Sequence, residues 1–92
     1  MNVKNEADSR GLILGLLYEN GYGGVVVEPN NFAPPMDRHV IFNVGSYFHK
    51  DGIISDFPSD TGTGYFMQIT LRGQAIWEGR QEATLDVAIP PQ

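Results

Sequence analysis

Side chains able to recognise a polar or charged ligand gather on one arc of residues 37–54, DRHVIFNVGSYFHKDGII. At about 100° per residue along a helix, this arc holds both histidines, two of the six basic residues and no acid, although the chain has a formal charge of −5. The uneven distribution makes this arc the candidate binding face. Its members are Arg38, His39, Phe42, Asn43, Ser46, His49 and Lys50.

The same segment has the start and stop signals of an amphipathic helix that ends at Asp51 and Gly52 and is followed directly by a strand. Asp37 has the side chain of an N-terminal cap, and Gly52 supplies the left-handed conformation that commonly follows a helix. The opposite arc is apolar and predicts the face that packs on the core. Its members are Val40, Ile41, Val44, Tyr47 and Phe48.

Catalysis and metal binding have little support in the residue pattern. His39 and His49 are separated by ten residues, or about 15 Å of helix, so they cannot chelate one ion. The chain has no cysteine, and no serine has the context of an activated nucleophile. Asp56 and Asp60 are typical of solubilising acids at a loop tip. We expect neither an enzyme nor a metal or other cofactor.

The composition predicts a single domain over residues 1–92. The absence of cysteine suits a reducing cytoplasm. The apolar run LILGLLY is too short for a membrane span, and no signal peptide is recognisable. The negative charge argues against strong nonspecific binding to nucleic acid, so any DNA contact has to come from a local patch.

A first helix is predicted from Ser9, with Leu12, Ile13, Leu16 and Leu17 on its apolar face and a stop at Asn20 and Gly21. Residues 1–8 form either an arm or the first turn of this helix. Two apolar residues lie off the predicted face, and they pack on a second layer or a partner subunit, or are covered by the chain's own tail. They are Leu14 and Tyr18.

The β-branched run at residues 25–27 predicts a short strand. Residues 28–35, EPNNFAPP, read as a loop with at most one helical turn. A β-hairpin is expected next, with strands at residues 53–57 and 65–70 around a turn-rich tip at residues 58–64.

Thr70 has the chemistry to cap a last helix over residues 71–81. Gly73 costs this helix about 1 kcal/mol relative to alanine, which suggests close approach of another backbone, most simply the first helix. Residues 80–92 form a tail in which Leu85, Val87 and Ile89 alternate with other residues. The tail predicts an added strand, within the subunit or across a homodimer.

Two stretches, YFHKDGII and ITLRGQAIW, resemble a winged helix-turn-helix domain of the kind found in MarR- and PadR-type regulators and in small phage-encoded proteins. The resemblance covers residues 9–79. It implies an α+β fold with three helices and a small antiparallel sheet whose hairpin forms the wing. The chain departs from the family at residues 28–35, where the second helix is shortened or missing, and at the wing tip, which has no lysine or arginine.

The resemblance implies a DNA-binding transcriptional regulator, with helix 37–51 in the major groove of double-stranded DNA. Arg38 and Asn43 would then contact base edges, and Arg72 would support phosphate contacts from the last helix. Ser46, His49 and Lys50 would follow the phosphates, with His39 on the same face. The competing interpretation is that this arc is only a solvated helix face.

Phe42 lies in the middle of the candidate face and has two interpretations. A phenylalanine can contact a thymine methyl group, but exposed aromatic side chains also mark protein interfaces. Together with the acidic surface and the wing without lysine, it supports an alternative function. The alternative is a winged-helix module that binds a protein partner and not DNA.

Overall fold

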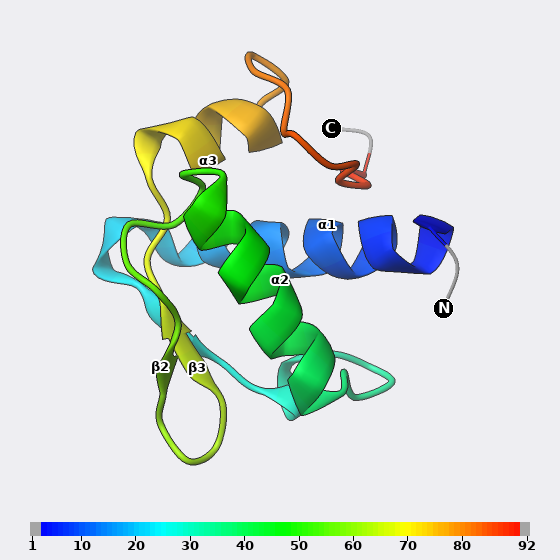
Figure 1. Ribbon diagram of the computed structural model, residues 1–92, viewed down its shortest axis with the longest axis vertical. Coiled ribbons are helices and arrows are strands. Elements are labelled where there is room, and N and C mark those ends of the chain that lie inside the picture. Colours follow the sequence, from blue (N-terminus) through cyan, green and yellow to red (C-terminus); the bar gives the residue numbers. More distant parts are fainter. Residues whose placement is uncertain (1–2, 91–92) are drawn as a thin grey trace.

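The computed structural model describes residues 3–90 and has an α+β fold with three α-helices and one three-stranded antiparallel sheet. In Figure 1, α2 crosses α1, the hairpin lies at one side and α3 precedes the C-terminal tail. The elements are α1 (Val3–Asn20), η1 (Gly21–Gly23), β1 (Val25–Val27), η2 (Pro29–Asn31), α2 (Arg38–Lys50), β2 (Ser59–Asp60), β3 (Tyr65–Met67) and α3 (Leu71–Trp77).

Helix α1 begins earlier than the apolar spacing alone predicts. Of the two alternatives predicted for residues 1–8, an arm or the first turn of the helix, the structure shows helix for residues 3–8. Residues 1–2 lie outside the described part of the chain. The predicted apolar face is partly wrong. Ile13, Leu14 and Leu17 are buried, whereas Leu12 is 54% exposed. The buried arc is rotated because α2 and α3 both pack against α1.

Helix α2 confirms the predicted boundaries and core face. The Asp37 carboxylate accepts a hydrogen bond of 2.7 Å from the backbone N–H of His39. The helix ends at Lys50, and Gly52 adopts a φ of 77°, a left-handed conformation that favours glycine. Ile41, Val44 and Phe48 are buried, and the partly buried Val40 and Tyr47 pack beside them.

The sheet has the strand order β1-β3-β2, with Val26 opposite Phe66 and Asp60 opposite Tyr65. The predicted strand at residues 53–57 is wrong, because only Ile54 forms a bridge, to Ile69. The backbone N–H groups of residues 53 and 54 instead donate to the Phe48 carbonyl. The hairpin begins only at Ser59, after a proline that has no N–H to donate. The return strand is shorter than predicted and ends at residue 67.

Helix α3 is capped by Thr70, whose hydroxyl accepts a hydrogen bond of 3.1 Å from the Gly73 N–H. The helix ends at Trp77 rather than at residue 81, and Gly79 follows with a φ of 80°. The predicted close backbone approach at Gly73 occurs, but its partner is not α1. A Cβ at Gly73 would lie 2.6 Å from the carbonyl oxygen of Ile53.

Residues 80–90 form no strand within the subunit, so that alternative is wrong for the described tail, and a strand formed across a homodimer stays a prediction. The tail lies on helices rather than on a sheet edge. Its N–H groups donate to isolated acceptors on the helices and do not form the regular hydrogen bonds of a β-ladder. Ala88 donates to the Ala7 carbonyl over 3.0 Å, and Leu85 donates to the Tyr47 hydroxyl over 2.8 Å. Leu14, Tyr18 and this tail all have contacts within one chain, and the homodimer stays a prediction.

Candidate interaction surfaces

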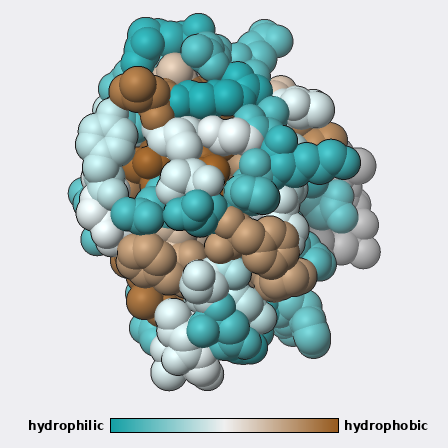
Figure 2. All heavy atoms as spheres, turned by 60° about the vertical axis from the view of Figure 1, so that its left-hand side comes forward, coloured by the Kyte–Doolittle hydropathy of each residue, from teal (hydrophilic) through white to brown (hydrophobic). Residues whose placement is uncertain are grey.

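The candidate face of α2 is joined to the hairpin by a cluster of aromatic rings. The Phe42 ring lies 5.7 Å from Phe57 and 5.3 Å from Tyr65, measured between ring centroids. His49 packs edge-on against Phe57 at 5.7 Å, and Phe57 is 51% exposed. Figure 2 shows hydrophobic side chains gathered on the hairpin side of the molecule, between more hydrophilic regions. We call Arg38, Phe42, His49, Phe57 and Tyr65 the aromatic surface.

Arg38 is directed at the hairpin. Its guanidinium donates to the Asp60 carboxylate over 2.7 Å and to the Tyr65 hydroxyl over 3.3 Å. The guanidinium carbon also lies 4.7 Å from the centre of the Tyr65 ring, a cation–π arrangement. The Gly62 N–H, and then Arg38, hold the pKa of the Asp60 carboxyl below its ordinary value. Arg38 therefore completes the aromatic surface instead of projecting as an isolated cation.

The Arg72 guanidinium is engaged in hydrogen bonds at the C-terminal end of α2. Its guanidinium donates to the Asp51 carbonyl over 2.7 Å and to the Asp51 carboxylate over 2.9 Å. It also donates to the Gln81 side chain and to the Glu82 carbonyl. These bonds use most of the five N–H groups of an arginine. The predicted support of DNA phosphates by Arg72 would require breaking them.

Asp51 is the acceptor that ties α2, α3 and the tail together. Besides Arg72, it accepts hydrogen bonds from the Tyr47 hydroxyl and from both the N–H and the hydroxyl of Thr84. Burial opposes its ionisation, but the Thr84 and Arg72 bonds outweigh burial and lower the pKa of the Asp51 carboxyl from 3.8 to about 2. Burial, followed by the bond to Asp51, raises the pKa of Tyr47 despite the opposing Leu85 N–H.

The arginines of the chain are all matched with carboxylates. Each has an acidic side chain within 4.0 Å: Arg10 with Glu6, Arg38 with Asp60, Arg72 with Asp51 and Arg80 with Glu78. Lys50 is exposed, and within residues 3–90 it makes no ion pair. Among the side chains that the structure describes, little positive charge is therefore free to neutralise phosphates.

The other members of the predicted face point outward without joining the aromatic surface. His39 and Asn43 are exposed, as is Lys50, while Ser46 is partly buried. Helix α2 itself has no acidic residue. In the described part of the chain, no group of three or more histidine and acidic side chains is arranged to hold a metal ion.

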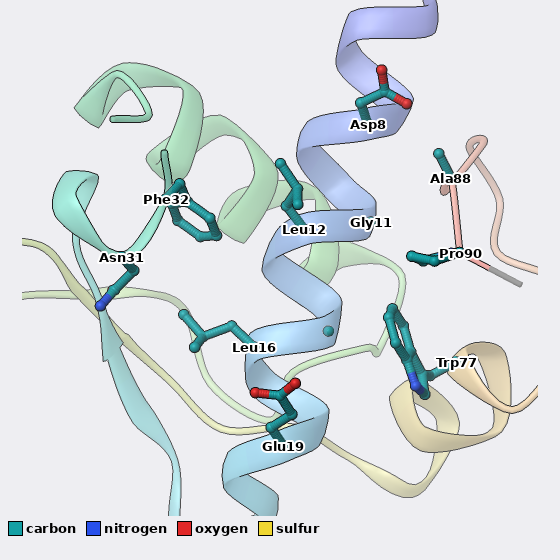
Figure 3. Close-up of a pocket in the computed structure, with 11 residues that line it drawn as sticks. Asp8, Gly11, Leu12, Leu16, Glu19, Asn31, Phe32, Trp77, Ala88 and Pro90 are labelled. Atoms are coloured by element: carbon teal, nitrogen blue, oxygen red, sulfur yellow. The ribbon is translucent and has the colours of Figure 1, made fainter. Parts of the chain in front are cut away.

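A second surface, which the sequence did not predict, is a groove along α1 with a volume of about 560 Å³. Figure 3 shows α1 as its floor, with Phe32 on one side and Trp77 and Pro90 on the other. Leu12 and Leu16 project into it. We call this the α1 groove, and its lining is Asp8, Gly11, Leu12, Gly15, Leu16, Glu19, Asn31, Phe32, Trp77, Ala88 and Pro90.

Sequence reasoning missed parts of both surfaces. The only early signal of the α1 groove was the number of leucines in α1, which exceeds what one buried face needs. The sequence pattern predicts Phe57 and Tyr65 only as strand residues and indicates no binding role for them. Their clustering with Phe42 depends on the path of the chain before the hairpin, which the pattern did not predict.

The fold and these surfaces define a small α+β domain with two apolar surfaces suited to binding. No family model, curated protein or solved structure matches the chain. None of the described helices combines the length and apolar character needed to cross a membrane.

Proposed function

We propose that this protein is a winged-helix protein-interaction module that binds a partner protein through the aromatic surface. The element order supports the winged-helix part of the proposal: helix, short strand, helix, hairpin and closing helix follow one another. The segment between β1 and α2 has only the single turn η2. The usual second helix of a helix-turn-helix is thus reduced, which weakens the scaffold for DNA binding.

The observation that carries the proposal is a partly exposed aromatic cluster where a DNA reader needs free cations. Phosphate contacts from lysine and arginine supply most of the affinity of nonspecific DNA binding and much of that of specific binding. Here Arg38 is bonded to Asp60 and stacked on Tyr65. Phe57 remains half exposed beside them. Such a combination of aromatic and arginine side chains is enriched in protein interfaces.

A partner would bind by covering the exposed edge of this cluster. An apolar side chain placed against Phe57 and Phe42 would be removed from water on both sides. Arg38 and Asp60 would lie at the rim, where a hydrogen-bonded pair contributes specificity more than affinity.

DNA binding by α2 is the second candidate function. It is favoured by the outward face formed by His39, Asn43 and Lys50, because α2 has no acid on it. In this function Asn43 would contact a base edge and Lys50 a phosphate. Arg38 would have to exchange Asp60 for DNA.

The experiment that tests the proposal compares proteins captured from the native host by the wild-type chain, Phe57→Ser and Leu71→Ser. Leu71 is an exposed leucine on α3, outside both surfaces. We expect a protein that binds wild type and Leu71→Ser but not Phe57→Ser. Binding of the same proteins by all three chains would contradict the proposal, and amide NMR spectra would verify that Phe57→Ser is folded.

A further inference from the structure

The α1 groove is built for an elongated apolar segment. Its floor is a stripe of α1 that includes the exposed Leu12 and the partly buried Leu16. One wall is the loop around Phe32, and the other is Trp77 with the tail at Pro90. A helix laid along such a floor contacts it through residues at positions i, i+3, i+4 and i+7.

The wall at Trp77 is fixed by close packing. The Trp77 ring lies against Gly15, where a Cβ would come within 2.8 Å of the ring. Its other neighbour is Tyr18, at 5.8 Å between ring centroids, and the Tyr18 hydroxyl donates to the Glu78 carboxylate. The groove is therefore preformed, so an occupant meets a smaller cost of ordering the protein.

The α1 groove has an acidic side chain at each end. Asp8 lies at one end and Glu19 at the other, and no basic residue lines it. These acids are eleven residues apart on α1, or roughly 16 Å at the rise of an α-helix. An apolar segment with a positive charge at each end would complement both of them.

A second copy of this chain is a poor occupant. If two copies paired through their α1 floors with the helices antiparallel, Asp8 of each would approach Glu19 of the other. Like charges at an interface oppose association and act against the wrong partner. The acidic ends therefore select a different, basic partner.

We propose that the α1 groove docks an amphipathic helix of a partner protein. The helix presents aliphatic side chains to Leu12, Leu16 and Trp77, and it carries lysine or arginine about eleven residues apart, beside Asp8 and Glu19. This site is independent of the aromatic surface, which is built from α2 and the hairpin. The chain then has two docking surfaces, and loss of binding at one leaves the other.

Trp77 is the only tryptophan of the chain, so its fluorescence reports on the groove directly. The probe is a synthetic amphipathic helix without tryptophan, with leucines on one face and two flanking lysines eleven positions apart. A matched peptide has glutamates in place of these lysines. We expect the lysine peptide to change the Trp77 emission and to shift the amide NMR signals of residues 11–19. We expect the affinity of the glutamate peptide to be lower by about tenfold or more.

Charge reversal on the protein completes the test. In the double variant Asp8→Lys, Glu19→Lys we expect the preference to invert, so that the glutamate peptide binds more tightly. Glu82→Lys changes the same kind of exposed charge outside the groove and should keep the original preference. Equal binding of both peptides, no response of Trp77, or self-association abolished by Leu12→Lys would overturn the proposal. Phe57→Ser should leave the peptide titration unchanged, which separates this result from the test of the aromatic surface.

Discussion

At the scale of single residues, Asp51 is the hydrogen-bond acceptor that connects α2, α3 and the tail. Its side chain is only 9% exposed and pairs with Arg72. Through Thr84 it also fixes the start of the tail beside the end of α2. Removing this shared acceptor leaves its donors without a partner.

We predict that Asp51→Asn lowers the free energy of unfolding by about 2 kcal/mol at neutral pH. The folded-state pKa of this carboxyl is depressed from 3.8 to about 2, so its contribution is present above 3.8 and disappears as the pH falls toward 2. Urea unfolding of both chains at a series of pH values measures it. If the difference in free energy of unfolding between the two chains stayed constant from neutral pH down to a pH of about 2, the role of the carboxylate would be contradicted.

At the scale of elements, α1 shows how far a periodic pattern leads. Leucines fill both the buried arc and the open side of this helix, so spacing alone does not say which arc faces the core. The structure places Leu14 at 0% exposure and Leu12 at 54%. The neighbouring elements α2, α3 and the tail determine this choice.

We predict opposite sensitivities for these leucines. Leu14→Ala should lower the free energy of unfolding by about 2–5 kcal/mol, because it leaves a cavity in the core. Leu12→Ala should change it by less than about 1 kcal/mol. Thermal and urea unfolding of both variants measure the effects, and equal losses would show that α1 is rotated from its described orientation.

Local chemistry predicted some elements well and others poorly. The caps Asp37 and Thr70 specify where α2 and α3 begin, because each side chain satisfies a free N–H of the helix it precedes. The segment after Gly52 is apolar like a strand, yet the N–H groups of Ile53 and Ile54 donate back to the Phe48 carbonyl. Gly73 signalled a close approach, but no pattern in the sequence identifies the Ile53 carbonyl as its partner.

The candidate site was predictable to the same degree. Helical periodicity correctly gathered Arg38, Phe42 and His49 on one side of α2. It did not show that Arg38 would meet Asp60, or that Phe57 and Tyr65 would pack against Phe42, because these contacts depend on how the hairpin folds back. The proposal of a protein-binding surface in place of a DNA-binding one depends on those tertiary contacts.

At the scale of the whole molecule, the charge distribution favours the proposed protein-binding function over DNA binding. The chain has a net charge of −5, and each arginine has a carboxylate within 4.0 Å. The pairs of Arg38 with Asp60 and of Arg80 with Glu78 are exposed, and such pairs are weak individually. Within residues 3–90, the four pairs together leave Lys50 as the unpaired basic side chain of α2. In the proposed function, apolar contact would supply most of the binding free energy.

The most direct test of this account is an amide NMR titration of the full chain with mixed-sequence duplex DNA at low salt. We expect small shifts scattered over the surface, with residues 38–50 no more affected than the rest. Shifts confined to residues 38–50 that fade as salt is added would contradict the account, because they would show that α2 binds DNA although Arg38 is paired with Asp60.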